Sequence, residues 1–130
     1  MKNEPISGEF GAYLRKMRIE KDAKVGSLAK EAGISIQYLS DIMKGHRYPP
    51  KSLVQLEALA NGLQMTCEER DTLFDLAGSV RRQVAPDLIS YVMDPEIPSL
   101  RMVLRKARDL HLGDDFWQQV MEKINTEDLS

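Results

Sequence analysis

The sequence is poor in the side chains that cross-link proteins or bind metals. It contains one cysteine, Cys67, and two histidines, His46 and His111, which lie far apart along the chain. A single cysteine cannot form an internal disulfide, and this favours a reducing compartment, so we expect a cytoplasmic protein. The three residues also lack the spacing of a metal cluster, and we expect neither a metal nor another cofactor.

Long apolar runs and enzyme motifs are absent as well. No stretch approaches the roughly 18 consecutive apolar residues of a membrane span, and residues 1–13 lack the apolar centre of a signal peptide. The sequence contains no Gly-rich phosphate loop, no nucleophile elbow, and no histidine near a cysteine or serine with an orienting acid. We therefore expect neither a membrane partner nor an enzyme.

The charge is divided unevenly along the chain. Hydrophobic residues make up 42% and charged residues 29% of the 130 residues, which is the balance of a globular protein. The formal net charge is only -2, but residues 1–64 hold ten Lys/Arg against seven Asp/Glu, a balance of +3. Residues 65–130 hold eight against thirteen, a balance of -5. This division predicts that the two halves face different partners.

Almost every segment repeats its apolar residues with the period of an α-helix, and none alternates with the period of a strand, which predicts an all-α fold. We expect helices over about 8–21, through Leu28 to Gly33, from Ser35 to about Lys44, from Leu53 to Gly62, and from Thr66 to Gly78. Residues 81–86 have the composition of a linker, and the helices expected after it cover about 87–93, Leu100 to Leu110, and the segment from Gly113. We therefore expect a domain over 1–80 and an acidic helical extension over 81–130.

Local signals mark several of these helix ends. Gly33 suits the left-handed conformation that follows many helices, and Gly45 stands at the next helix end. The Ser35 hydroxyl can cap the third helix, and Thr66 with Glu69 fits a capping box.

The third helix has a polar outer face. If Leu39 points inward, a turn of about 100° per residue places Gln37, Asp41 and Lys44 nearly opposite. Taken alone, such a face also fits a solvated surface helix. The preceding short helix and glycine turn, with small residues Ala29 and Gly33 where the two helices approach, favour a helix-turn-helix unit that presents its second helix to the major groove of DNA.

Residues 27–63 also carry a family pattern. Its members are Leu28-Ala29, Gly33, Ser35, Tyr38-Leu39-Ser40, Ile42, Gly45, Arg47, Pro49 and the series Leu53, Leu56 and Leu59. Through them the chain resembles the lambda-repressor-like (Cro/C1, or Xre) regulators of bacteria and phages, over about residues 8–77. The resemblance implies a five-helix DNA-binding domain, followed here by a C-terminal helical extension, and a homodimer that binds palindromic operators in double-stranded DNA.

The resemblance also implies which residues touch DNA. The base-contacting candidates are Ile36, Gln37, Ser40 and Asp41. Gln37 can pair with adenine N6 and N7, Ile36 can pack on a thymine methyl, and Asp41 can accept from cytosine N4. The phosphate-contacting candidates are Lys24, Ser35, Tyr38, Lys44, Arg47 and Lys51, which orient the protein without reading sequence. Tyr38 is equally suited to steady the helix pair as a half-buried ring.

Two positions depart from the family pattern. Val25 occupies a place where the family often has a phosphate-gripping glutamine, and Met43 replaces a glutamate that often pairs with the arginine at Arg18. We expect Arg18 to find another acceptor, such as Glu57 or a carbonyl, or to reach solvent. With Asp41, these oddities also suit a helical interaction module that no longer binds DNA.

Within the acidic extension, residues 86–124 are similar to tails of longer Xre-type regulators. Its apolar faces can form a core with the fifth helix or with each other, a dimer interface, or a docking surface for a second protein. The basic residues Arg101, Arg105, Lys106 and Arg108 lie on a polar face, which we interpret as solvated. We expect a sequence-specific transcriptional regulator that acts as a repressor. The alternative within this scaffold is an antitoxin-like autoregulator that binds a partner protein.

Overall fold

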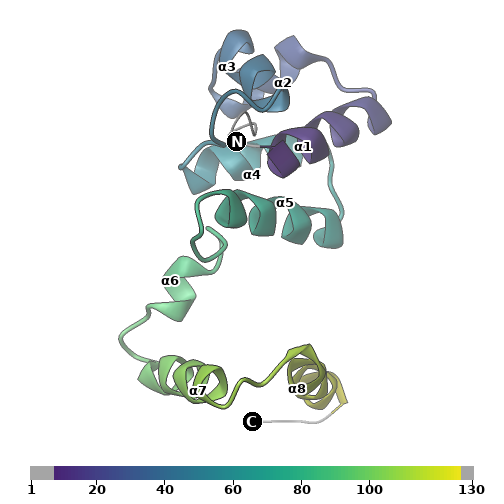
Figure 1. Cartoon of the computed structure of the whole chain (residues 1–130). Coiled ribbons are helices and arrows are strands. Elements are labelled where there is room, and N and C mark those ends of the chain that lie inside the picture. The colour runs from purple at the N-terminus through teal and green to yellow at the C-terminus, as the bar shows by residue number, and fades with distance from the viewer. Residues whose placement is uncertain (1–7, 127–130) are drawn as a thin grey trace. The chain divides into compact units, whose positions relative to one another are not determined.

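Within residues 8–126, which the structure describes, the chain forms helices and connecting turns and no strand. The structure is a computed structural model (Figure 1). Its helices are α1 (Gly8–Glu20), α2 (Val25–Ala32), α3 (Ile36–Met43), α4 (Leu53–Gly62), α5 (Cys67–Val80), α6 (Ile89–Val92), α7 (Pro98–Asp109) and α8 (Asp114–Thr126). The predicted all-α fold, with five helices and a helical extension, is confirmed. Among these helices, none is long and apolar enough to cross a membrane.

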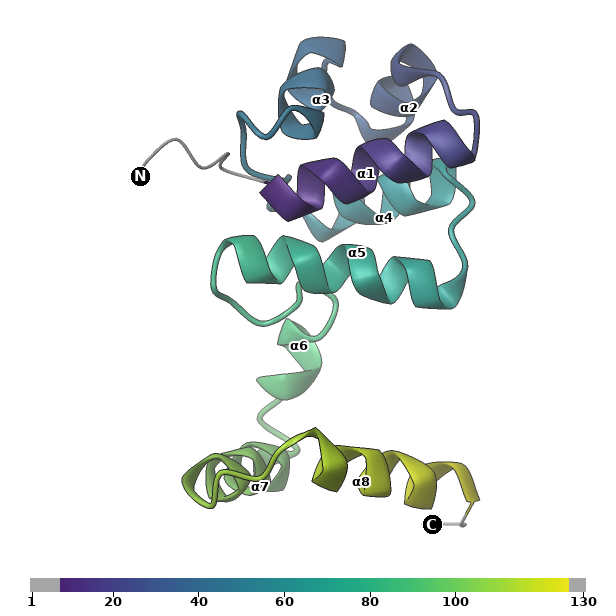
Figure 2. The same cartoon turned by 45° about the vertical axis from the view of Figure 1, so that its right-hand side comes forward.

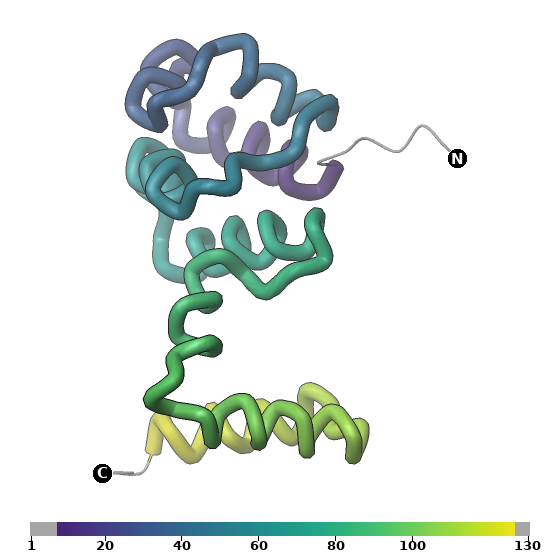
Figure 3. The backbone as a smooth tube through the Cα atoms, turned by 90° about the vertical axis from the view of Figure 1, so that its left-hand side faces the viewer, coloured from purple at the N-terminus to yellow at the C-terminus, as the bar shows by residue number. Residues whose placement is uncertain are grey.

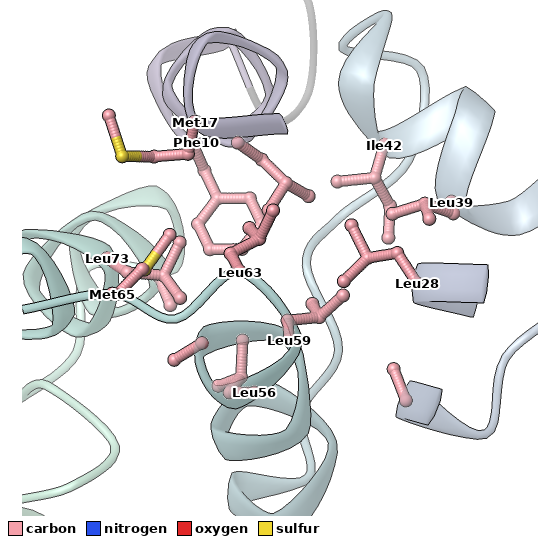
Figure 4. Close-up of a cluster of buried hydrophobic side chains, with 14 of the residues drawn as sticks. Phe10, Met17, Leu28, Leu39, Ile42, Leu56, Leu59, Leu63, Met65 and Leu73 are labelled. Atoms are coloured by element: carbon pink, nitrogen blue, oxygen red, sulfur yellow. The ribbon is translucent and has the colours of Figure 1, made fainter. Parts of the chain in front are cut away.

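Helices α1 to α5 enclose one apolar core. Helix α1 packs on α3 and α5, and α2 packs on α3 and α4 (Figure 2). Side chains that are at most 2% exposed come from every one of these helices, and they include Phe10, Leu14, Leu28, Leu39, Ile42, Leu56, Leu59 and Leu73. Figure 4 shows the cluster, with Phe10, Leu28 and Leu59 among the labelled side chains. Each such burial contributes about 1.5–3 kcal/mol relative to exposure. The core therefore holds the helix-turn-helix unit, α2 and α3, on a rigid base.

The backbone of α1 lies directly against the backbone of α3. A Cβ atom at Gly11 would collide with the carbonyl oxygen of Ile42, so only glycine fits at this crossing. Arg15 extends the contact, because its Nη2 donates to the carbonyl oxygen of Met43 at 3.4 Å. The last turn of α3 is thus held directly against α1.

The start of α5 is tied to α1 through Glu69. Its Oε1 accepts from the Thr66 backbone N–H at 2.9 Å and from Lys21 Nζ at 2.9 Å, while Thr66 Oγ1 accepts from the Glu69 N–H at 3.2 Å. The predicted capping box is confirmed. The Thr66 N–H, and then the Lys21 ammonium, hold the pKa of the Glu69 carboxyl below its ordinary value.

Two glycines end helices as predicted. Gly33 adopts φ 72° after α2 and Gly45 adopts φ 83° after α3, both in the left-handed region that glycine favours. A Cβ atom at Gly33 would meet nothing within 4 Å. Glycine is therefore favoured at position 33 by the positive φ angle. We had expected a close approach between α2 and α3 at this residue, and the structure does not show one.

The residues after α5 fold back onto it, as Figure 3 shows. A Cβ atom at Gly78 would lie 2.8 Å from the carbonyl oxygen of Gln83 and 3.0 Å from the nitrogen of Ala85. Ala85 is buried with the core. The packing accordingly divides the chain into Met1–Ile89 and Ser90–Ser130, later than the boundary at residue 80 expected from composition. That the two units act as separate domains stays a prediction.

The second unit has almost no interior of its own among its described residues, 90–126. Only Ala107 is buried there. Arg101 connects α7 to the end of α6 and the turn that follows, because its Nη1 donates to the carbonyl oxygens of Val92 at 2.8 Å and Asp94 at 2.9 Å. Helix α6 is shorter than predicted, because residues 87 and 88 form a turn before it and Pro95, which has no N–H, restricts the residue before it at the other end. Helix α7 begins at Pro98, two residues before the expected Leu100, because proline suits the first position of a helix.

Candidate nucleic-acid interface

Helix α3 begins with a side-chain cap and buries one face. Ser35 Oγ accepts from the Tyr38 backbone N–H at 3.0 Å, as predicted for the cap. Leu39 and Ile42 are fully buried, and Met43 is 8% exposed. The opposite face, which carries Gln37 and Lys44, is exposed. The apolar face therefore fixes which side of α3 faces away from the core.

Two of the base-contacting candidates, Gln37 and Asp41, are hydrogen-bonded to each other on this face of α3. Gln37 Nε2 donates to Asp41 Oδ1 at 2.9 Å, one helical turn further along. A carboxylate can only accept, so the bond defines which end of the Gln37 amide faces Asp41. The second N–H and the carbonyl oxygen of that amide are the pair that adenine N7 and N6 require. Asp41 thus orients Gln37 on the surface of the helix.

The other two base-contacting candidates differ in exposure. Ile36 is 58% exposed and lies beside the start of α2, where a Cβ atom at Gly26 would be 3.7 Å from Ile36 Cδ1. Ser40 is only partly exposed. Asp41 is partly exposed as well, so Ile36 and Gln37 in the first turn of α3 are the more exposed of the four candidates.

Tyr38 braces α3 against the segment that follows it. Its hydroxyl donates to the carbonyl oxygen of Tyr48 at 3.2 Å, and its ring packs partly on the core. The Arg47 guanidinium lies 5.0 Å from the centre of the same ring, a cation–π arrangement worth about 0.5–1 kcal/mol at an exposed site. Tyr38 therefore fills the bracing role considered from the sequence and also positions Arg47.

The charged phosphate-contacting candidates lie next to the ends of α2 and α3 and in the segment between α3 and α4. Lys24 precedes α2, Lys44 follows the last residue of α3, Arg47 lies in the α3–α4 segment, and Lys51 lies just before α4; all four are exposed. Ser35 is exposed too, and although its oxygen accepts as a cap, its O–H can still donate. These groups can reach a phosphate without leaving the surface.

The two unusual positions have apolar surroundings. Val25 packs partly on the core, and Met43 belongs to it. Arg18 donates from Nη1 to the carbonyl oxygen of Ala23 at 3.2 Å, one of the acceptors expected for it, while its Nε is buried without a hydrogen-bond partner. Neither position changes the exposed face of α3.

Arg81 stabilises the segment between α3 and α4, a role that the sequence did not predict. Its Nη2 donates to the carbonyl oxygen of Pro49 at 2.7 Å, and its guanidinium lies 4.8 Å from the centre of the Tyr48 ring. It thereby holds the α3–α4 segment from the end of α5. No sequence signal pointed to this contact, because Arg81 and Pro49 lie 32 residues apart and Arg81 stands in a segment with the composition of a linker. Over residues 8–126 the structure brings together no group of three His, Cys, Asp or Glu suited to a metal ion.

The family of the chain follows from comparison with known proteins. The model of the helix-turn-helix domain family matches residues 9–73, which are half of the chain, and the chain belongs to this family. The match is consistent with the Cro/C1 or Xre type. No curated protein matches the chain. The domain suggests a DNA-binding regulator, in a family that is typically not enzymatic.

Proposed function

We propose that the protein is a sequence-specific regulator that binds double-stranded DNA as a homodimer, recognises a palindromic operator and represses transcription. The observation that carries the proposal is the exposed face of α3, where Gln37 and Asp41 form one hydrogen-bonded pair. A helix of this kind fits the major groove, where each base pair presents a distinct pattern of donors and acceptors.

In the proposed complex, base reading and phosphate gripping fall to different residues. Gln37 pairs with adenine, Ile36 packs on a thymine methyl, and Asp41 either orients Gln37 or accepts from cytosine N4, with Ser40 beside them. Phosphates are held by Lys24, Ser35, Lys44, Arg47 and Lys51, and Tyr38 supports Arg47. The 5.0 Å contact between Arg47 and the Tyr38 ring supports this assignment, because it holds the guanidinium beside α3.

We further propose that the extension, residues 81–130, supplies the dimer interface. The support is its exposed apolar surface: Val103 and Leu104 on α7 are 51% and 38% exposed, and Met121 and Ile124 on α8 are 59% and 55% exposed. Several large apolar side chains exposed on two helices of one small unit are typical of a partner-binding region. Two-fold symmetry would set the paired α3 helices one turn of DNA apart, about 34–36 Å.

The same exposed surface favours one second candidate, a regulator whose extension docks a different protein, as in an antitoxin-like autoregulator. Light scattering on the whole protein separates the two. A dimer at micromolar concentration supports self-association, and a monomer that still binds DNA points to a second protein.

Selection of bound fragments from a random duplex pool tests the function itself. We expect a palindromic sequence to be enriched, and log affinity for it to fall steeply with log salt between about 50 and 200 mM, as neutralised phosphates release counterions. Arg47→Ala should weaken binding to the enriched and to random duplexes alike. A flat salt response with no enriched sequence contradicts the proposal and favours a helical interaction module that does not bind DNA.

A further inference from the structure

A groove that lies only partly within the family-matched residues opens between the α3–α4 segment and the end of α5. It has a volume of about 760 Å³. Tyr48 and Lys51 line it from the α3–α4 segment, and Arg81 and Arg82 line it from the chain that follows α5. The groove therefore joins two segments that lie far apart in the sequence.

The charged residues that line the groove all carry the same sign. They are Lys51, Arg81 and Arg82, and no carboxylate is among the lining residues. The remaining walls are mainly apolar, including Pro50 and Val80. Three cations around a partly apolar hollow attract an anion, and a guanidinium matches the geometry of a phosphate because it can donate two parallel hydrogen bonds.

The groove is continuous with the phosphate contacts proposed above. Lys51 belongs to both. Arg81 is held in place by its 2.7 Å bond to the Pro49 carbonyl and by the Tyr48 ring, and the Tyr48 carbonyl in turn accepts from Tyr38 on α3. A phosphate in the groove would thus lie against the same segment that carries Arg47.

We propose that this groove binds a backbone phosphate of the operator, with Arg81 and Arg82 as phosphate-contacting residues beyond Lys51. The proposal rests on the proposed function, since it extends the footprint of the same protein on the same DNA. It assigns a DNA-contacting role to residues that follow the helix-turn-helix domain, on a segment that folds back onto α5.

The test is the salt dependence of duplex binding by the whole protein. Arg82→Gln removes one charge at an exposed position. We expect the slope of log affinity against log salt to fall by about 0.9 for each phosphate that is no longer neutralised, and by about twice that in a dimer. Lys16→Gln is the matched control, because Lys16 lies exposed on α1 and makes the same charge change outside the groove. Its slope should equal that of the wild type.

Arg81 requires a second variant, because Arg81→Gln also removes the brace on the α3–α4 segment. Arg81→Lys keeps the charge and removes the planar donor. Under the proposal, Arg81→Gln lowers the slope as Arg82→Gln does, while Arg81→Lys retains most of it. Equal slopes for the wild type and for both Gln variants overturn the proposal, and circular dichroism checks that each variant is folded.

Duplexes with a single neutral methylphosphonate linkage identify the phosphate itself. One position should weaken the wild type clearly more than it weakens Arg82→Gln, since that variant keeps only Arg81 and Lys51 at this phosphate. If no linkage shows this pattern, the groove does not hold a DNA phosphate.

A last arm uses inorganic phosphate at constant ionic strength, without DNA. Saturable binding that disappears in Arg82→Gln, together with unchanged DNA slopes, assigns the groove to a small free phosphate and overturns the DNA proposal. The failure of the proposed function gives a different result. If the salt response of the wild type is flat, the protein does not bind DNA. If the wild-type response is steep and the Gln variants share it, the protein binds DNA but the groove does not contact a phosphate.

Discussion

Helices α1 to α5 and the unit of residues 90–126 carry apolar residues at the same helical spacing but differ in what covers them. Leu39 and Leu56 are fully buried, whereas Leu104 is 38% exposed and Ile124 is 55% exposed. In the first region five helices converge on one core. In the second, the short α6 and two longer helices enclose only Ala107. Helical periodicity therefore shows which face of a helix is apolar, and a neighbouring element decides whether that face is buried.

Removing residues 90–130 should produce the largest change in dimerisation and in operator affinity. A chain that ends after Ile89 should fold, because the core is complete by Ala85, but it should no longer dimerise. Loss of the linked second half-site should lower operator affinity by about 10²–10⁴-fold. Light scattering and duplex titration measure both effects.

A chain that ends at Gln83 is the informative control for this truncation. It lacks Ala85, which is buried against α5, so it should be less stable than the chain ending after Ile89. If the chain ending after Ile89 is as dimeric as the whole protein, the dimer interface lies within residues 1–89, and the extension has another partner.

Matched Leu→Ala substitutions compare the two regions directly. Leu39→Ala leaves a cavity in the core and should lower the free energy of unfolding by about 2–5 kcal/mol. Leu104→Ala should cost less than about 1 kcal/mol at low protein concentration, since Leu104 is partly exposed. Urea unfolding at two protein concentrations checks this, and a Leu104→Ala cost that grows with concentration supports an interface on α7.

Within the first region, Gln37→Ala should separate base reading from folding. We expect a loss of about 1–3 kcal/mol on the cognate site, with a relaxed preference at one base pair in each half-site. The free energy of unfolding should change little, because Gln37 is exposed. Competition titrations with cognate and random duplexes measure the difference, and an equal loss on both would show that Gln37 does not read bases.

The smallest effect expected is on the pH dependence of the α1–α5 unit. The pKa of Glu69 is lowered in the folded protein, so its ionised form stabilises the fold above the unfolded pKa, and this contribution is lost as pH falls through the folded value. Glu69→Gln should therefore reduce stability at neutral pH and flatten its decline in acid. Thermal melts from pH 7 to 3 measure this, with the exposed neighbour Glu68→Gln as control. Parallel curves for both variants would count against the role of Glu69.

Local chemistry was readable along the chain. The ends of α2 and α3 and the start of α5 depend on bonds between residues three to five positions apart, made by Gly33, Gly45, Thr66 and Glu69. The polar face of α3 follows from periodicity in the same way. The sequence therefore predicted the helices and the exposed side of α3, whereas the DNA contacts of that side stay a prediction.

The tertiary structure decided the features that depend on distant residues. Gly11 must be glycine because Ile42 crosses it, and Arg81 braces Pro49 from 32 residues away. Residues 83–85 have the composition of a linker but pack on α5, because Gly78 leaves room for them. By itself the sequence determined the helices and their apolar faces, since backbone hydrogen bonds, caps and glycine turns act within a few residues. Only the packed chain decided which faces became core and which cations came to share a groove, because those outcomes require segments from different parts of the sequence to meet.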